Sequence, residues 1–250
     1  MNQSQKPRCQ HCDGSGIEVF TDKNGVQCAR TCLCRLRERY EYTCRNAGFN
    51  LADTKTIDEY QRWNHATAKA RMAAENYIRD FDIIRRQRQN WFVVFGQSGS
   101  GKTMLGRAIV KALIERSKPV GATAVKYYEM MQKLKSMSND TDYWKILDGY
   151  TNCDLLFIDD LLKEKATYGE LTEADIKHLF AVIDTRYDVQ QPTIITTECT
   201  GQRLKALNSA IYYRMAERAY AEIIFDGNEN NYRKKTLTFH EHGASPYKRT

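Results

Sequence analysis

Short continuous runs of apolar residues recur along this chain. Residues 91–95 (WFVVF) and 155–158 (LLFI) contain only large apolar side chains, and residues 192–198 (PTIITTE) are mostly β-branched before they become polar. Runs of this length, without alternation, are typical of strands that are buried on both faces of a parallel sheet. A further strand is predicted near residues 122–128.

Segments with helical periodicity separate these runs. In the clearest of them, apolar side chains stand at the spacing i, i+3, i+4 and i+7, namely at Ile176, Leu179, Phe180 and Ile183. Thr172 and Asp175 stand ahead of this stripe in the arrangement of a capping box, which predicts the start of a helix. Other helices are predicted at residues 57–88 and 102–117 and within 130–150. Strands that alternate with helices predict an α/β fold with a central parallel sheet.

The turn after the first run carries the most specific motif of the chain. Residues 96–103 (GQSGSGKT) fit the P-loop pattern G-x-x-x-x-G-K-[ST], in which backbone N–H groups and a helix N-terminus face a phosphate. Lys102 would reach the β and γ phosphates, and the Thr103 hydroxyl would ligate Mg²⁺. The predicted nucleotide-binding residues here are Gly96, Gln97, Ser98, Gly99, Ser100, Gly101, Lys102, Thr103 and Met104.

A pair of acids follows the second run. Asp159 and Asp160 stand directly after residues 155–158, as in a Walker B element. Asp159 would hold the Mg²⁺ ion and also belongs to the nucleotide site, while Asp160 would orient and deprotonate the attacking water. Because a protein that only binds nucleotide does not need the second acid, the pair predicts hydrolysis. The alternative for Asp160 is a helix cap or a loop acid.

Five of the eight cysteines lie within the first 34 residues. Closely spaced cysteine pairs joined by a loop can supply the four ligands of a tetrahedral zinc site without a large core. The predicted ligands are Cys9, Cys12, Cys32 and Cys34. Cys28 could replace Cys34, since Cys28 and Cys32 also form a closely spaced pair. The single cysteines are expected to be buried thiols, at Cys44, Cys153 and Cys199.

The length and the net charge of the chain indicate its size class and its possible partners. The 250 residues suffice for one α/β core with a small appendage, and no stretch approaches the roughly 18 apolar residues of a membrane span. We therefore expect a cytoplasmic protein without membrane contact. The net charge of +7 suits contact with nucleic acid. Candidate contacts are basic residues near the C-terminus (Arg233, Lys234, Lys235, Lys248 and Arg249) and Lys126, Tyr127 and Tyr128, for which ordinary core and surface roles are the alternative.

Taken together, these segments resemble the DnaC/DnaI family of bacterial and phage replicative helicase loaders, which are AAA+ ATPases related to the IstB transposition helpers. The resemblance extends over about residues 9–233. Besides the cysteine-rich head and the P-loop, it rests on residues 155–165 (LLFIDDLLKEK), 183–198 (IDTRYDVQQPTIITTE), 212–218 (YYRMAER) and 231–235 (NYRKK).

The resemblance implies an AAA+ P-loop ATPase that is preceded by a small zinc-binding domain. It implies ATP, Mg²⁺ and Zn²⁺ as cofactors. The implied partners are a hexameric replicative DNA helicase, single-stranded DNA and further copies of this chain. The corresponding division is a helicase-binding zinc domain at residues 1–50, a linker and helix at 51–90, the ATPase at 91–240 and a basic tail at 241–250.

Residue roles follow from the same resemblance. Thr197 and Glu198 fall at the γ-phosphate sensor, Arg214 matches the arginine finger that acts on a neighbouring subunit, and Arg233 falls in a tyrosine-arginine element. Arg214 and Arg218 stand one helical turn apart, so both are expected to project from one exposed face towards a neighbouring molecule. A solvated basic helix face is the alternative.

Glu198 departs from the family, because loaders usually carry Asn at this position and a carboxylate would be repelled by a γ-phosphate. Either Thr197 senses the phosphate, or Glu198 turns to a basic partner, or hydrolysis is slow. Three alternative functions remain at this point. They are an IstB-like regulator of transposition, a phosphotransferase for a small molecule, and a zinc-dependent adaptor that binds ATP without hydrolysing it.

Overall fold

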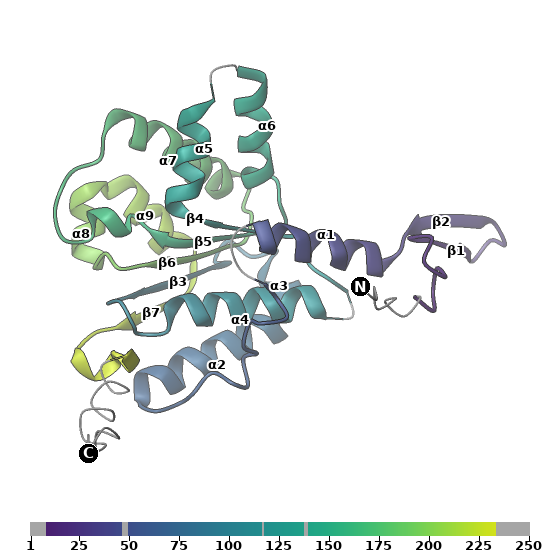
Figure 1. The fold of residues 1–250 in the computed structure, drawn as a ribbon, viewed down its shortest axis with the longest axis horizontal. Helices are drawn as coiled ribbons and strands as arrows, with labels where there is room; N and C mark the ends of the chain where they lie inside the picture. The colour runs from purple at the N-terminus through teal and green to yellow at the C-terminus, as the bar shows by residue number, and fades with distance from the viewer. Residues whose placement is uncertain (1–8, 47–49, 117, 138–139, 234–250) are drawn as a thin grey trace, which may run out of the picture.

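A central sheet of parallel strands organises the molecule. The computed structural model describes residues 9–46, 50–116, 118–137 and 140–233, so residues 234–250, which include the predicted basic tail, lie outside the described residues. In the described part, five strands lie in the order β4-β5-β6-β3-β7 (Figure 1). Their bounds are β3 (Trp91–Gly96), β4 (Ala122–Lys126), β5 (Leu155–Leu161), β6 (Thr193–Thr197) and β7 (Ala219–Phe225). The predicted α/β class is confirmed, and the three apolar runs form the adjacent strands β5, β6 and β3.

Helices cover both faces of this sheet. On one face lie α2 (His65–Arg79), α3 (Phe81–Ile84) and α4 (Lys102–Glu115). On the other lie α5 (Tyr127–Ser136), α6 (Asp140–Thr151), α7 (Glu173–Asp188), α8 (Gly201–Leu207) and α9 (Ser209–Arg218). The 3₁₀ turns are η1 (Lys163–Lys165) and η2 (Asn228–Asn230).

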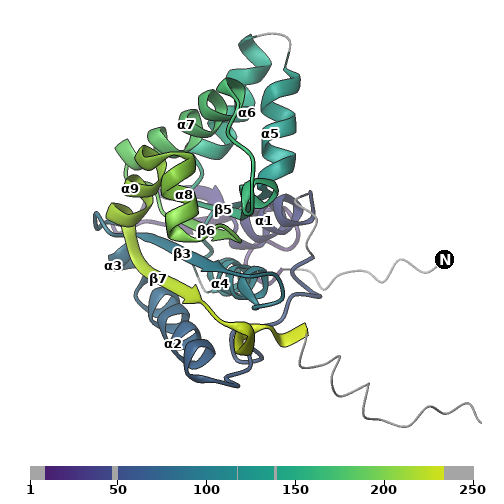
Figure 2. The ribbon, with the colours of Figure 1, turned by 90° about the vertical axis from the view of Figure 1, so that its left-hand side faces the viewer.

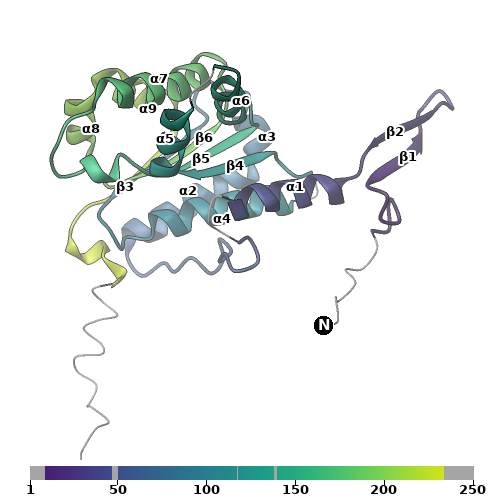
Figure 3. The same cartoon turned by 45° about the horizontal axis from the view of Figure 1, so that its top comes forward.

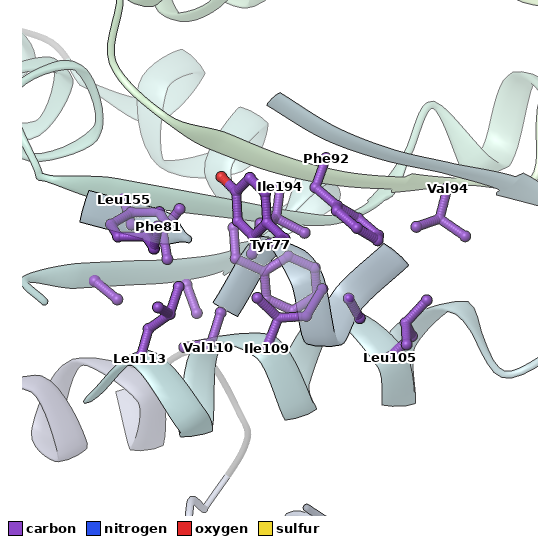
Figure 4. Close-up of a cluster of buried hydrophobic side chains, with 14 of the residues drawn as sticks. Tyr77, Phe81, Phe92, Val94, Leu105, Ile109, Val110, Leu113, Leu155 and Ile194 are labelled. Carbon is purple, nitrogen blue, oxygen red and sulfur yellow. The ribbon is translucent and has the colours of Figure 1, made fainter. Parts of the chain in front are cut away.

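The strand β3 shows why its sequence is apolar throughout. Phe92 and Val94 pack towards α2 and α4 (Figure 4), while Trp91, Val93 and Phe95 belong to the cluster on the opposite face. Side chains of a strand alternate between its two faces, so a strand with helices on both sides needs apolar residues at every position. Each buried side chain of this size contributes about 1.5–3 kcal/mol.

The helix predicted over residues 57–88 is shorter in the structure and this prediction is wrong at both ends, because α2 begins at His65 and ends at Arg79, ahead of the separate short helix α3. α2 begins at His65 because Asn64 caps it: Oδ1 of Asn64 accepts the amide of Thr67 at 2.8 Å, and Oγ1 of Thr67 accepts the amide of Asn64 at 3.0 Å. This reciprocal pair satisfies N–H groups that a helix end leaves free. Residues 57–64 are therefore available to line a site instead.

The C-terminal part of the sheet contains a strand that the sequence analysis did not predict. β7 follows α9 directly and pairs in parallel with β3, for example Val94 with Ile223. Figure 2 shows β7 running beside α2 towards the C-terminal segment. As an edge strand, β7 alternates buried Ile223 and Phe225 with exposed Glu222 and Ile224.

The cysteine-rich head is a hairpin that projects from the body of the molecule (Figure 3). It consists of β1 (Ile17–Thr21) and β2 (Gln27–Thr31), which pair antiparallel, and is followed by α1 (Leu33–Asn46). α1 packs on the ATPase layer: Nη2 of Arg37 donates to the carbonyls of Glu115 at 3.2 Å and Arg116 at 2.9 Å, and Cys44 is fully buried in the core. The domain boundary at residue 50 stays a prediction, but α1 contacts the ATPase.

Within the described ranges, every helix is too short or too polar to cross a membrane.

Candidate active site

The P-loop is the turn between β3 and α4. Gly99 (φ +83°) and Gly101 (φ +89°) lie in the left-handed region, which side chains rarely adopt. A Cβ at Gly99 would lie 2.6 Å from Oδ1 of Asn231, and one at Gly101 would lie 3.2 Å from the phenol oxygen of Tyr60. Glycine at these positions therefore lets other parts of the chain pack closely against the turn.

Lys102 is the first residue of α4 and is almost entirely buried. Its Nζ donates to the carbonyl oxygen of Gln97 at 2.8 Å, within the P-loop itself. Burial lowers the pKa of Lys102, while nearby carboxylates, chiefly Glu198 and Asp160, act in the opposite direction. A phosphate would offer this partly desolvated ammonium a full negative charge in place of the carbonyl, which makes a stronger contact.

Replacing Lys102 with alanine is expected to weaken ATP binding by about a hundredfold, because a buried charge-assisted contact of roughly 3 kcal/mol is lost. Equilibrium binding of a fluorescent ATP analogue measures this. Lys118→Ala is the control, since Lys118 is exposed and follows the C-terminal end of α4. Equal affinities for the two variants would contradict the role of Lys102.

The two residues predicted to hold magnesium lie in contact. Oγ1 of Thr103 donates to Oδ1 of Asp159 at 2.8 Å, and Asp159 is 5% exposed. Mg²⁺ in nucleotide sites takes a carboxylate or a hydroxyl together with phosphate oxygens and waters. The residues present therefore fit this ion: Thr103 and Asp159 would hold it, and the ion would neutralise charge on the phosphates.

Thr196 is a site residue that the sequence analysis missed. This fully buried residue of β6 donates from Oγ1 to Oδ1 of Asp159 at 2.6 Å and accepts the amide of Asp160 at 2.9 Å. One hydroxyl thus contacts both acids at the end of β5. The signal in the chain was the polar residue near the end of a predicted parallel strand, because such ends meet at one edge of the sheet.

Asp160 lines the cavity beside the P-loop and makes an ion pair there. Its Oδ2 lies 2.8 Å from Nζ of Lys163, and that ammonium also lies 3.5 Å from Oε1 of Glu198. The hydrogen bond to Asp160 raises the pKa of Lys163, so the lysine is charged. Glu198 therefore faces a basic partner, one of the arrangements expected from the sequence.

The hydroxyl of Thr197, the other candidate sensor, forms hydrogen bonds with the backbone in the protein interior. The residue is fully buried, its Oγ1 donates to the carbonyl of Leu161 at 2.7 Å, and the same oxygen accepts the amide of Cys199 at 3.0 Å. Glu198, rather than Thr197, lines the cavity. Of the two candidate sensors, Glu198 is therefore the one that lines the same cavity as the P-loop.

A cavity of about 790 Å³ lies over the P-loop, within the size range of small-molecule sites. From the P-loop, residues 98–104 line it, while Gly96 and Gln97 do not. The capped start of α2 allows residues 50–63 to form part of the wall. There the phenol oxygen of Tyr60 is buried without a hydrogen-bond partner among the described residues, and burial raises the pKa of Tyr60.

The segment after β7 closes another side of the cavity. The amide of Tyr232 donates to the carbonyl of Gly99 at 3.0 Å, and the rings of Tyr232 and Trp63 lie 6.3 Å apart. Nη1 of Arg233 reaches Oγ of Ser98 at 3.4 Å. The predicted tyrosine-arginine element therefore lies at the P-loop, where Arg233 could contact a phosphate.

Arg214 lies outside this cavity, on α9. Its Nε donates to Oδ1 of Asp184 at 2.5 Å, and its guanidinium lies over the rings of Phe180 and Tyr187 at 5.0 and 5.4 Å. The expectation that Arg218 shares the exposed face is wrong. Arg218 is 1% exposed and donates to Oδ1 of Asn90 at 2.8 Å.

The four predicted zinc ligands gather at the base of the head hairpin. Their sulfurs all lie within 4.8 Å of one another, with Cys9 and Cys32 3.7 Å apart and Cys12 and Cys34 3.5 Å apart. Four thiolates with Zn–S bonds of about 2.3 Å stand roughly 3.8 Å apart in a tetrahedron, so this cluster fits zinc. Cys28 lies outside it, on β2 opposite Phe20.

The arrangement can support hydrolysis of a nucleoside triphosphate. Lys102 and the P-loop amides can hold the phosphates, Thr103 and Asp159 can hold Mg²⁺, and a second acid lies beside them. Asp160 can orient water for attack once its carboxylate is released from Lys163.

Comparisons with known proteins indicate an ATP-binding protein. The sequence profile of the IstB-like ATP-binding proteins matches residues 19–238. In Bacillus subtilis strain 168, the uncharacterised protein YqaM is 33% identical over 153 residues, which are 60% of this chain and 48% of YqaM. The chain thus spans about half the length of YqaM. XkdC, from the phage-like element PBSX, is 24% identical over 222 residues, which are 84% of this chain and 78% of XkdC.

Among solved structures, the crystal structure of the DnaC helicase loader shares the fold. It superposes with a TM-score of 0.57 at 20% identity, and the match covers 68% of this chain and 96% of that one. The family profile and this likeness confirm the predicted AAA+ ATPase fold.

Proposed function

Because this chain belongs to the family of IstB-like ATP-binding proteins, we propose that it is an ATPase that loads a hexameric replicative helicase onto single-stranded DNA. The proposal rests on the presence in one chain of a P-loop site with both acids and of a cysteine head that fits zinc. The likeness to the DnaC helicase loader supports the choice of partner. Hydrolysis would release the loader from the helicase.

The head is the proposed helicase-binding part. Its hairpin exposes apolar side chains at Ile17 (55%), Val19 (65%) and Val26 (56%). Apolar side chains on so small a hairpin suit a protein partner, because a patch of this kind is protected from water on contact. Zinc would hold the hairpin in shape for that contact.

Single-stranded DNA is the proposed second partner. Of the candidate residues, Tyr127 is 2% exposed and belongs to the core, while Tyr128 is 59% exposed and available for base stacking. Lys126 is exposed and lies 3.4 Å from Glu129. The candidates Lys234, Lys235, Lys248 and Arg249 lie outside the described residues.

Self-association would complete the ATPase site. Arg214 lies away from the cavity of its own chain, so as an arginine finger it would serve the cavity of a neighbouring copy. Such head-to-tail contacts build rings or helical filaments.

The experiment is to measure the mass of complexes with candidate hexameric helicases, with ATP, with ADP and without nucleotide. We expect a stable complex whose amount depends on the nucleotide. A Val19→Asp variant is expected to lose the complex while it keeps its ATPase activity, because Val19 is exposed on the hairpin and remote from the cavity. Failure to bind any cognate helicase would contradict the proposal.

The second candidate is an IstB-like ATPase that regulates DNA transposition, which the family profile favours. Its partners would be a transposase and duplex DNA. Binding to duplex DNA in the presence of ATP, together with no helicase complex, would support this function instead.

A further inference from the structure

Lys163 is one of the cations that line the nucleotide cavity, together with Lys55, Lys102, Arg107 and Arg233. It is the first residue of η1, just after β5, and its side chain is 48% exposed. The ammonium lies between the carboxylates of Asp160 and Glu198, at 2.8 and 3.5 Å. Neither magnesium binding nor the P-loop contacts require a lysine at this position.

The charges of the cavity wall show what Lys163 can do. Asp160 and Glu198 both line the cavity, and two carboxylates would repel the highly charged end of a triphosphate. Thr197 is not available as a neutral sensor, because its hydroxyl contacts Leu161 and Cys199. Lys163, one of the cations that line the cavity, forms an ion pair with both of these carboxylates, so it places positive charge directly between them.

The backbone holds Lys163 in place. Leu162 has a φ of +53° with a fully buried side chain, and Asp160 has a φ of +58°. Left-handed backbone is unfavourable for leucine and persists only where the surrounding structure requires it. The amide of Lys165 donates to the carbonyl of Leu162 at 2.9 Å, which closes the turn.

We propose that Lys163 binds the γ-phosphate and distinguishes ATP from ADP in this protein. Without a γ-phosphate, the ammonium neutralises Asp160. With ATP bound, it moves to the γ-phosphate, Glu198 remains its anchor, and the carboxylate of Asp160 is free to act on water. Because the ion pair is partly exposed, it is weak enough for a phosphate to compete for the lysine. The inference concerns the ATPase site alone and does not depend on helicase loading.

The test compares affinities for β,γ-methylene-ATP, which is not hydrolysed, and for ADP, in the presence of Mg²⁺. In Lys163→Met we expect the analogue to bind at least about tenfold more weakly, as for loss of one charged hydrogen bond, while ADP binding stays within about twofold. Lys163→Arg should retain most of the discrimination. Lys165→Met is the matched control, because this lysine of the same turn does not line the cavity.

A second variant tests the role of Glu198. Adding Glu198→Gln to Lys163→Met should restore part of the lost analogue affinity, because it removes a carboxylate that no cation balances any longer. Two results would overturn the proposal. One is that Lys163→Met has the same ratio of analogue affinity to ADP affinity as the wild type. If ATP hydrolysis by this variant also becomes faster, the lysine only blocked Asp160. The other concerns the affinity for the analogue in Lys163→Met, in Glu198→Gln and in the double variant. If the change in the double variant equals the product of the changes in the two single variants, the two side chains act independently, and the proposal fails.

Discussion

Alanine at Arg214 is expected to leave ATP binding intact and to abolish the hydrolysis that assembly stimulates. An arginine finger stabilises the charge that develops on the transferred phosphoryl group and accelerates hydrolysis by roughly three to five decades. Arg214 suits this role because it lies outside its own cavity. Its partner Asp184 is 39% exposed, so the guanidinium can exchange this carboxylate for a phosphate of a neighbouring copy.

The measurement is phosphate release as a function of protein concentration, with Arg79→Ala as the control. Arg79 is an exposed arginine of α2 with one carboxylate partner, Asp80 at 2.7 Å. Mixing Arg214→Ala with Asp160→Asn chains tests the action in trans. In the mixture, an intact Asp160 from one chain and an intact Arg214 from the other form complete sites, so activity should partly return. Normal stimulated turnover of Arg214→Ala would refute the finger assignment.

Loss of zinc from the head is the second large effect that we expect. Both hairpin strands are exposed at nearly every position, and an isolated two-stranded hairpin is marginally stable at best. Zinc binding to such small sites supplies about 10–16 kcal/mol, which is the folding energy of the unit. Cys34→Ser should therefore lose zinc and the structure of the hairpin, while ATP binding remains.

Metal analysis of freshly purified, reduced protein should find one zinc per chain in the wild type and much less in Cys34→Ser. Cys28→Ser is the matched control, because Cys28 lies on β2 outside the sulfur cluster, and it should keep the metal. Limited proteolysis would report the hairpin in both variants. Wild-type protein without zinc, or loss of zinc from Cys28→Ser, would contradict the ligand set.

The edge strand β7 was harder to predict than the central strands. β3, β5 and β6 are buried on both faces, so their residues form continuous apolar runs from which the strands can be predicted. β7 lies at the edge, and its exposed positions interrupt the apolar pattern. No glycine or proline separates it from α9, so the sequence shows no break where the helix ends.

Side-chain direction also depended on the tertiary structure. The spacing of Arg214 and Arg218 is compatible with one exposed face, but Arg218 is turned inward, where it donates to Asn90. Asn90 lies immediately before β3, and the two residues meet because β7 returns beside that strand. Helical periodicity indicates approximately which residues share a face of a helix. It does not indicate which of these residues will find a buried partner.

Local motifs were determined by the sequence itself. The P-loop, the two acids near the end of β5, the capping box at Thr172 and the cysteine spacing require only neighbouring residues, or a strand followed by a turn. Their chemistry is therefore visible in the sequence. The contacts of Thr196 with the two acids, and the contact of Lys163 with Glu198, were decided only by the fold. They join the ends of β5 and β6, which are far apart in the sequence and become neighbours only when parallel strands pair.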